Sequence, residues 1–428
     1  DDDITKALIK AVNTRIANNT SRVRVVLSVS STCVQMFTKS QFVLLLNLAC
    51  GCLLSFSWTP QLVSRIRHPR VVKVNSIEHE TSSEAKKICA AVIVPGFLSG
   101  AGDFAALAKC LTAQGIPTVV VPMPVWHWLP CLGGRSMRPI LERIDHTVKH
   151  LAANGGNVDA VPRFEYSLAD CVGDFKDNPG GVAKVGGSDE VDDYPVVEPR
   201  GCFPAPTEPL QGRVALIGHS AGGWISRVYL SERPYGGKVY AGAKFVHSLV
   251  TLGTPHSEAP GPAFSGIRWA DREGLLPQVR GLAVGGTGTL GIPASGQLTM
   301  NSYSFCIDSN EDLDGDGITP IDSALAMPGT LLPDKSSQEA TSSPGKAEGE
   351  QSRQESNVDT LILPGVTHFP WSDVFGGGVV APELTARHKE GMPWYGSPEI
   401  IDLWAPWLAK ECGCNDFRSS DQFKSEGK

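Results

Sequence analysis

Short apolar runs alternate with stretches of helical periodicity along the middle of the chain. The apolar runs predict strands at 88–94, 118–121, 213–218, 245–252 and 358–365. The periodic stretches predict helices at 104–114, 139–152, 221–233 and 398–410. The strands are rich in Val, Ile and Leu without polar alternation, which is typical of strands buried on both faces. We therefore expect an α/β fold with a mostly parallel central sheet and helices on both faces.

Three stretches interrupt this alternation. Residues 154–209 are dense in Gly, Pro and Asp, and predict an insertion that is largely loop. Residues 334–356 contain almost no apolar side chains, and predict a disordered surface loop. Residues 257–300 are rich in Gly and Pro with scattered large apolar residues. We expect either a lid over a substrate or a surface excursion packed on the core.

The first 75 residues differ in composition from the rest of the chain. No acidic residue lies between Asp3 and Glu78, whereas Ser, Thr and Arg are frequent. This predicts an organelle transit peptide at 1–75, for a chloroplast or alternatively a mitochondrion. Residues 42–58 are almost wholly apolar, so a membrane anchor is the alternative. The α/β domain is then expected at 76–411, and a polar tail at 412–428.

Charge and cysteine content exclude some classes of protein. The net charge is −7, and the first 77 residues hold ten Lys/Arg against three Asp/Glu, so the remainder is strongly acidic. Nucleic acid is therefore not an expected partner. Eleven cysteines without a CxxC pair predict neither a disulfide framework nor a zinc site, and favour a reducing compartment. Cys412 and Cys414 are interpreted as incidental thiols of the tail.

A nucleophile-elbow pattern lies between one predicted strand and the next helix. Gly218, His219, Ser220, Ala221 and Gly222 match G-x-S-x-G, in which the glycines allow a sharp turn that exposes the serine. The flanking strand and helix are the context that this motif requires. Ser220 is therefore the candidate nucleophile, and His219 is expected to point elsewhere on the turn.

A serine nucleophile needs a histidine base and an acid that orients it, and in this fold class both come later in the chain. His368 follows the strand predicted at 358–365 by a short loop, and is the preferred base. Three other histidines are poorer candidates. His388 lies in a polar stretch, His247 lies inside a predicted strand, and His256 follows the strand next to that of the nucleophile.

The candidate acid lies in the carboxylate-rich segment 308–322. Asp316 is preferred there. The alternates that spacing leaves open are Asp312, Asp314 and Asp322. A calcium loop is a competing interpretation, but Gly317 and Ile321 occupy positions where that loop needs other residue types.

Acyl transfer also needs backbone donors for the developing oxyanion. The amide of Ala221 is one candidate, and that of Phe97 in the glycine-bearing turn after the first strand is the other, with Leu98 as its alternate. The apolar cluster at 124–130 either lines an acyl pocket or is simply buried.

These segments together resemble a known family, the α/β-hydrolases, and specifically the lipase-like branch of plants, algae and cyanobacteria. The similar segments are VPGFLSGAGDF, GGRSMRPILERIDHTV, GHSAGGW, LGTPH, GDGITPIDSAL and WYGSPEIIDLWA. The resemblance implies a triad of Ser220, His368 and Asp316. The branch also resembles, more distantly, lipid deacylases that act on membrane glycolipids.

The expected function is hydrolysis of carboxylic esters, with lipid acyl esters as the leading substrates, because apolar segments gather near the expected site. No cofactor or metal is expected, and contact with a membrane surface is possible. Two alternatives stay open. The same triad could transfer the acyl group to an alcohol, or the chain could be a catalytically inactive hydrolase fold that serves as a binding module.

Overall fold

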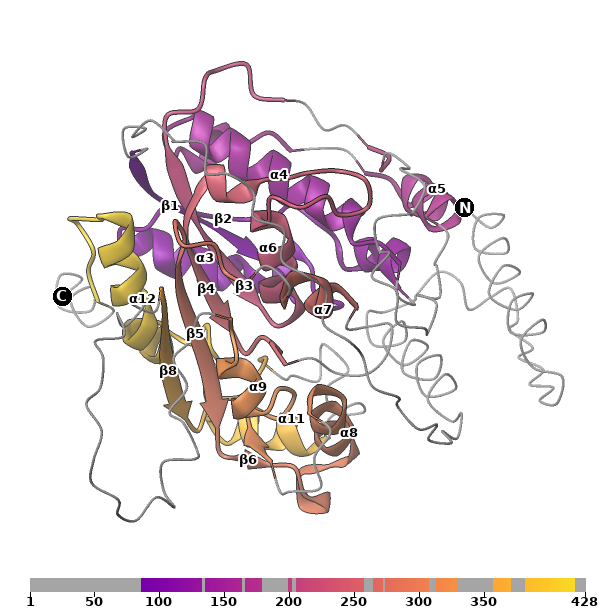
Figure 1. Cartoon of the computed structure of the whole chain (residues 1–428). Helices are drawn as coiled ribbons and strands as arrows, with labels where there is room; N and C mark the ends of the chain where they lie inside the picture. Colours follow the sequence, from indigo (N-terminus) through magenta and orange to yellow (C-terminus); the bar gives the residue numbers. More distant parts are fainter. Residues whose placement is uncertain are drawn as a thin grey trace, which may run out of the picture.

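A parallel sheet forms the centre of the molecule (Figure 1). The computed structural model describes residues 86–132, 135–163, 166–178, 199–201, 205–257, 265–271, 274–307, 313–328, 357–370 and 382–419. The sheet has six strands in the order β2-β1-β3-β4-β5-β8, and every neighbouring pair is parallel. The strands are β1 (Lys87–Val94), β2 (Thr118–Val120), β3 (Arg213–His219), β4 (Val246–Leu252), β5 (Arg280–Thr287) and β8 (Val358–Pro364).

Helices cover both faces of this sheet, as the sequence predicted. One face carries α4 (Arg138–Ala153), α6 (Ala221–Leu230) and α7 (Ser265–Asp271). The other carries α3 (Ala105–Ala113) and α12 (Pro398–Cys412). Successive side chains of a strand point to opposite faces. Val92 of β1 accordingly packs in the first layer and Ile93 in the second, which explains the continuous apolar run.

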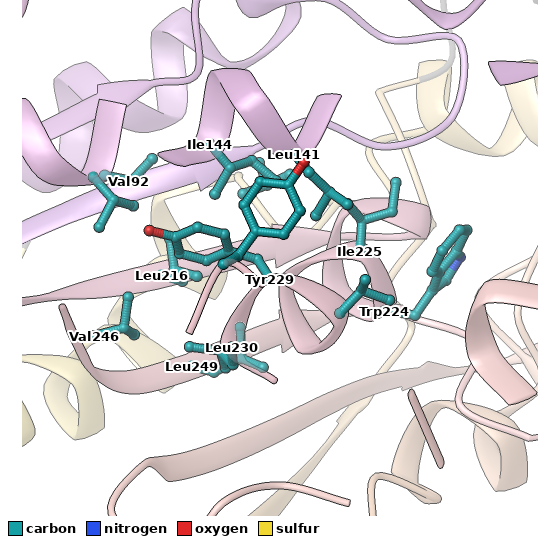
Figure 2. Close-up of a cluster of buried hydrophobic side chains, with 14 of the residues drawn as sticks. Val92, Leu141, Ile144, Leu216, Trp224, Ile225, Tyr229, Leu230, Val246 and Leu249 are labelled. Atoms are coloured by element: carbon teal, nitrogen blue, oxygen red, sulfur yellow. The ribbon is translucent and has the colours of Figure 1, made fainter. Parts of the chain in front are cut away.

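The layer between the sheet and α4 and α6 is a closely packed apolar core. Figure 2 shows Leu216 of β3, Leu141 and Ile144 of α4 and Tyr229 of α6 in one cluster of buried side chains. All four side chains are completely buried. This packing fixes the position of α6 on β3, and therefore fixes the turn between them.

Smaller elements lie beyond the carboxyl ends of β5 and β8, where Figure 1 shows α8, α9, α11 and β6 gathered. They are β6 (Thr289–Leu290), α8 (Gln297–Cys306), β7 (Asp314–Gly315), α9 (Ile321–Leu325) and α11 (Pro382–Lys389). The remaining elements are α5 (Leu168–Asp177) and the short 3-10 helices η2 (Ala101–Phe104), η3 (Val125–Cys131), η4 (Val158–Ala160), η5 (Gly242–Lys244) and η7 (Pro293–Ser295). Functional side chains of parallel sheets are commonly found at this edge.

Two segments contain more regular structure than the sequence suggested. Residues 280–287, inside the expected lid at 257–300, form β5 in the interior of the sheet, so that segment as a whole is neither a lid nor a surface excursion. The expected loop insertion at 154–209 contains α5. Ser167 and Asp170 cap this helix reciprocally, which stabilises its first turn.

The tail is also attached to the fold, and Cys414 is not the incidental thiol that the sequence suggested, whereas Cys412 is a free thiol. Cys414 forms a disulfide with Cys89 of β1, with the Cα atoms 5.3 Å apart. The amide of Arg418 donates a hydrogen bond to the carbonyl oxygen of Gln114, at 2.9 Å. Since these partners are far apart in sequence, spacing alone could not reveal them.

Several predictions concern residues outside the described part of the chain. They are the transit peptide at 1–75, the apolar segment at 42–58 and the loop at 334–356. Among the residues that the structure describes, no helix has both the length and the apolar character needed to cross a bilayer.

Candidate active site

Ser220 occupies a sharp turn between β3 and α6. Its φ is 50° and its ψ is −126°, a backbone conformation that is rare for a residue with a side chain. The two glycines of the motif make room for this turn. A Cβ atom on Gly222 would lie 2.2 Å from the carbonyl oxygen of Val94, and one on Gly218 would lie 2.4 Å from the Cα atom of Gly223. The Ser220 side chain stays half-buried, while the strand before it is buried.

Two hydrogen bonds hold the strained turn in place. The Ser220 amide donates to the carbonyl oxygen of Leu252 at the end of β4, at 2.9 Å. The hydroxyl group of Thr254 donates to the Ser220 carbonyl oxygen, also at 2.9 Å. Strain of this kind persists only where the surrounding structure over-determines it. The end of β4 and the loop after it therefore hold the serine in this conformation.

His368 and Asp316 form a buried pair at the same edge of the sheet. Nδ1 of His368 lies 2.7 Å from Oδ2 of Asp316. Because a carboxylate only accepts, Nδ1 carries the proton and Nε2 is left as an acceptor. The backbones are joined too, since the His368 amide donates to the Asp316 carbonyl oxygen at 2.9 Å.

The Asp316 carboxylate is fully enclosed by donors. Its Oδ1 accepts from the amides of Ile318, at 2.9 Å, and Thr319, at 2.7 Å. Its Oδ2 accepts from the hydroxyl of Tyr395, at 2.8 Å, as well as from His368. The side chain has no exposed surface. A buried charge with four donors is well stabilised, so its orientation is fixed.

His219 connects the elbow to the loop that carries His368. Its Nε2 donates to the His368 carbonyl oxygen at 2.8 Å, and the two rings are 4.7 Å apart between centroids. Burial, together with the nearby His368, lowers the pKa of His219 to about 3. His219 thus points toward the loop that carries His368, and its ring makes no hydrogen bond to the Ser220 side chain in the described structure. As a neutral donor, it links the end of β3 to the backbone of His368.

Two glycines allow close approach of the backbone to the candidate residues. A Cβ atom on Gly253 would lie 2.5 Å from Oδ2 of Asp316 and 3.0 Å from Nδ1 of His368. A Cβ atom on Gly96 would lie 2.9 Å from Cβ of Ser220. Gly253 therefore lies against the Asp316–His368 pair, and the loop after β1 lies against Ser220.

The other candidate histidines have different surroundings. His256 is enclosed between Arg227 and Thr251, with its Nδ1 3.3 Å from the guanidinium and its Nε2 3.1 Å from the hydroxyl. Burial followed by the positive charge of Arg227 lowers its pKa well below the ordinary value. His247 is buried in β4, and the Nδ1 of His388 contacts a backbone carbonyl in its own turn.

The alternate carboxylates do not reach His368 in the described structure. Oδ1 of Asp314 accepts from the amides of Gly288 and Gly315, at 2.8 and 2.7 Å. Asp322 is exposed in the first turn of α9. Asp312 lies outside the described residues.

The candidate oxyanion donors lie at the start of α6 and in the turn after β1. Ala221 is the first residue of α6, where the helix dipole also favours negative charge. Phe97 and Leu98 form the turn after β1, and Leu98 has a φ of 57°. Among the described residues, the amides of Phe97, Leu98 and Ala221 donate no hydrogen bond to the rest of the chain.

The apolar cluster at 124–130 is mixed in its exposure. Trp128 is buried, and its indole N–H donates to the carbonyl oxygen of Ser99 at 3.0 Å. Its ring meets that of Phe97 edge to face at 5.4 Å. Trp126 is half-buried and stacks on Tyr166. Trp128 therefore supports the turn that carries Phe97, whose own side chain is 47% exposed.

A metal site would need several His, Cys, Asp or Glu side chains gathered at one place. In the described part of the chain, no group of three His, Cys, Asp or Glu side chains is arranged to bind one. The segment 308–312, with which the competing calcium loop would begin, is outside that part.

Comparison with known proteins bears on the fold. A family profile for the PGAP1-like alpha/beta domain matches residues 203–264, which include β3, Ser220, α6 and β4. The fold is that of an α/β-hydrolase. The strand order, the elbow after β3 and the residues at the ends of β5 and β8 all agree with it. No curated protein sequence matches the chain.

Two similar solved structures come from Lactobacillus plantarum. One is assigned as a carboxylesterase from strain WCFS1, with 14% identity over 48% of this chain and 65% of that one, and a TM-score of 0.24. The second is a lipase/esterase with 16% identity over 48% of this chain and 70% of that one, and a TM-score of 0.24. The chain thus spans slightly less than two thirds of the first structure. At these TM-scores neither structure bears on the activity of the chain.

Proposed function

We propose that the chain is a serine hydrolase that cleaves carboxylic esters, with Ser220 as nucleophile, His368 as base and Asp316 as the orienting acid. The observation that carries the proposal is the buried hydrogen bond between His368 and Asp316, beside an elbow whose serine has a φ of 50°. Neither feature is needed to stabilise an ordinary strand-to-helix turn. Strained residues of this kind cluster at active sites.

The proposed reaction has two steps. Ser220 Oγ attacks the ester carbonyl carbon while Nε2 of His368 takes the hydroxyl proton. The same proton then passes to the leaving alcohol, and a water molecule releases the acyl group by the reverse sequence. Asp316 holds the imidazole in the tautomer that makes Nε2 the acceptor. The amides of Phe97 and Ala221 would stabilise the oxyanion in both steps.

We further propose that the acyl group is apolar, as in lipid esters. The support is the exposed Phe97 ring, since the amide of this residue is a candidate oxyanion donor. An apolar ring beside that donor would bury surface against an acyl chain. The resemblance of the site segments to the lipase-like branch of plants, algae and cyanobacteria points in the same direction.

Hydrolysis of p-nitrophenyl esters of increasing acyl length tests both parts of this proposal. We expect the full chain to cleave them, with kcat/KM rising with acyl length, and Ser220→Ala to lose at least about a thousandfold. Ser226→Ala is the matched control. The Ser226 hydroxyl lies in α6, is buried and donates to the Gly222 carbonyl oxygen at 2.7 Å.

Three other outcomes are informative. If neither esters nor a fluorophosphonate probe react with Ser220, the hydrolase proposal is wrong and the binding-module alternative gains support. Ester formation from an added alcohol, at the expense of hydrolysis, would instead favour an acyltransferase. A flat dependence on acyl length would contradict the lipid substrate alone.

A further inference from the structure

The Tyr395 hydroxyl has two partners that determine where its proton points. It accepts a hydrogen bond from the amide of Gly286 at the end of β5, at 2.7 Å. It lies 2.8 Å from Oδ2 of Asp316. A carboxylate cannot donate, so the phenolic proton must be directed at the carboxylate. Tyr395 has no exposed surface, and burial followed by the charge of Asp316 raises its pKa well above the ordinary value. The hydroxyl therefore remains a neutral donor.

This donor shares one oxygen atom with His368. Oδ2 of Asp316 accepts from Nδ1 of His368 at 2.7 Å and from Tyr395 at 2.8 Å. Each donor draws on the same negative charge. A carboxylate oxygen that is bonded to a neutral donor stabilises an adjacent imidazolium less than one that is not.

The segment that carries Tyr395 is rigidly joined to the loop that carries His368. The amide of Thr367 donates to the carbonyl oxygen of Pro393 at 2.8 Å. The Trp404 indole of α12 donates to the Tyr395 carbonyl oxygen at 3.0 Å. Tyr395 is thus held against the pair by α12 as well as by β5.

We propose that Tyr395 is a positioning residue that tunes the acid–base pair, by limiting how strongly Asp316 stabilises the protonated form of His368. The inference rests on the ester-hydrolase function proposed above. In that mechanism His368 must be unprotonated to accept the serine proton, so its protonation sets the acid limb of the pH profile. Because Tyr395 reduces the stabilisation of the His368 imidazolium by Asp316, it keeps the site active at lower pH.

Tyr303 is a natural matched control for this role. Its hydroxyl donates to the carbonyl oxygen of Thr289 at 2.8 Å and accepts from the amide of Gly317 at 2.9 Å. It is also buried. Like Tyr395, Tyr303 therefore donates one hydrogen bond to an oxygen atom and accepts one from a glycine amide, and it lies beside Asp316. Within the described structure, none of its hydrogen bonds reaches the Asp316 carboxylate.

The other titratable groups around the pair are few in the described elements. His219 faces His368 from the end of β3, and it is neutral. Tyr303 and Cys306 of α8 interact electrostatically with Asp316, and Asp314 of β7 interacts with Tyr303. None of these groups changes when Tyr395 is substituted, so a shift in the pH profile would be due to Tyr395.

The test is the pH profile of kcat/KM on p-nitrophenyl butyrate for the full-length protein, Tyr395→Phe and Tyr303→Phe. We expect the acid limb of Tyr395→Phe to move up by about half a pH unit, because the freed charge of Asp316 stabilises the imidazolium. The acid limb of Tyr303→Phe should coincide with that of the unmodified protein. Both variants leave one glycine amide without its partner, so their losses of thermal stability should be similar.

A second measurement keeps the test decisive if Tyr395→Phe does not fold. Replacing Tyr395 by 3,5-difluorotyrosine keeps the shape of the ring and makes the hydroxyl a stronger donor, so the acid limb should move to lower pH. An unshifted limb in Tyr395→Phe, or failing that in the fluorinated protein, overturns the inference and leaves Tyr395 with a structural role only. Activity that persists in Ser220→Ala would instead overturn the proposed function, which is a separate result.

Discussion

The Nε2 atom of His219 lies 2.8 Å from the carbonyl oxygen of His368. The residue just before the candidate nucleophile is therefore bonded to the backbone of the candidate base, although the two are 149 positions apart in the sequence. Burial lowers the pKa of His219 to about 3, so the ring is neutral and Nε2 always carries a proton at neutral pH. The contact fixes the distance between the elbow and the loop of the base.

Loss of this contact should lower activity. We expect His219→Leu to reduce kcat/KM on p-nitrophenyl esters about a hundredfold, because small displacements of a catalytic group are costly. His219→Gln is the matched control, since its amide nitrogen can reach the position of Nε2 and should restore part of the rate. Equal rates in both variants would show that the ring, and not its hydrogen bond, is what the site requires.

The same histidine should make the fold sensitive to acid. Its folded-state pKa of about 3 is below the ordinary value of 6.5, so between these limits the unfolded chain binds a proton that the folded chain excludes. The free energy of unfolding must then fall as the pH falls through this window, by about 1.4 kcal/mol per unit. In urea unfolding at several pH values, the free energy of unfolding of His219→Gln should depend less steeply on pH than that of the unmodified protein. Other buried histidines contribute equally to both proteins, so parallel curves would contradict the assignment.

Gly253 should tolerate no side chain. Its φ is +56°, and a Cβ atom there would lie 2.5 Å from Oδ2 of Asp316. We expect Gly253→Ala to lower kcat/KM by about a hundredfold or more, because the methyl group separates Asp316 from His368. Gly413→Ala is the control: its φ is +68°, and its Cβ would have no neighbour within 4 Å. It should lose about 1 kcal/mol of stability from backbone strain and keep its activity. Comparable activity in the two variants would contradict the expected clash.

Thr254 is expected to preserve the strained turn at Ser220. Thr254→Val keeps the shape of the side chain but removes the hydroxyl that donates to the Ser220 carbonyl oxygen. The variant should lose about 1 kcal/mol in urea unfolding and react more slowly with a fluorophosphonate probe. Thr254→Ser retains the donor and should behave like the unmodified protein. If Thr254→Ser reacts as slowly as Thr254→Val, loss of the hydroxyl group alone does not explain the slower reaction.

The sequence alone predicted five of the six strands of the sheet. The run 88–94 is apolar throughout and 213–218 is apolar after Arg213, because β1 and β3 are covered on both faces. β5 gave no such signal because three of its eight residues are glycines. A Cβ atom on Gly285 would lie 2.4 Å from Ile321 of α9, and one on Gly286 would lie 3.1 Å from the Tyr395 hydroxyl. The strand is glycine-rich because other elements pack directly on its backbone.

Only part of the candidate site could be predicted, because some of its contacts join residues that are far apart in the sequence. Ser220 has a local motif, and His368 follows a clear strand, so both could be proposed from sequence. Asp316 could be preferred over its neighbours only through the family resemblance, because spacing does not tell which carboxylate faces the histidine. The contacts of Tyr395 and His219 depend on residues far away in the chain, and such pairings leave no periodic signal.

The disulfide between Cys89 and Cys414 is another long-range pairing, and its effect on stability can be measured directly. It joins β1 to the end of α12 across 325 positions, so it restricts the unfolded chain strongly. We expect Cys414→Ser to lower the free energy of unfolding by about 3 kcal/mol. Reductant should destabilise the unmodified protein by a similar amount and leave Cys414→Ser unchanged. Cys110→Ser, which removes a half-buried free thiol, should keep the response to reductant. Iodoacetamide modification of Cys89 and Cys414 in denatured, unreduced protein would show that the bond does not form.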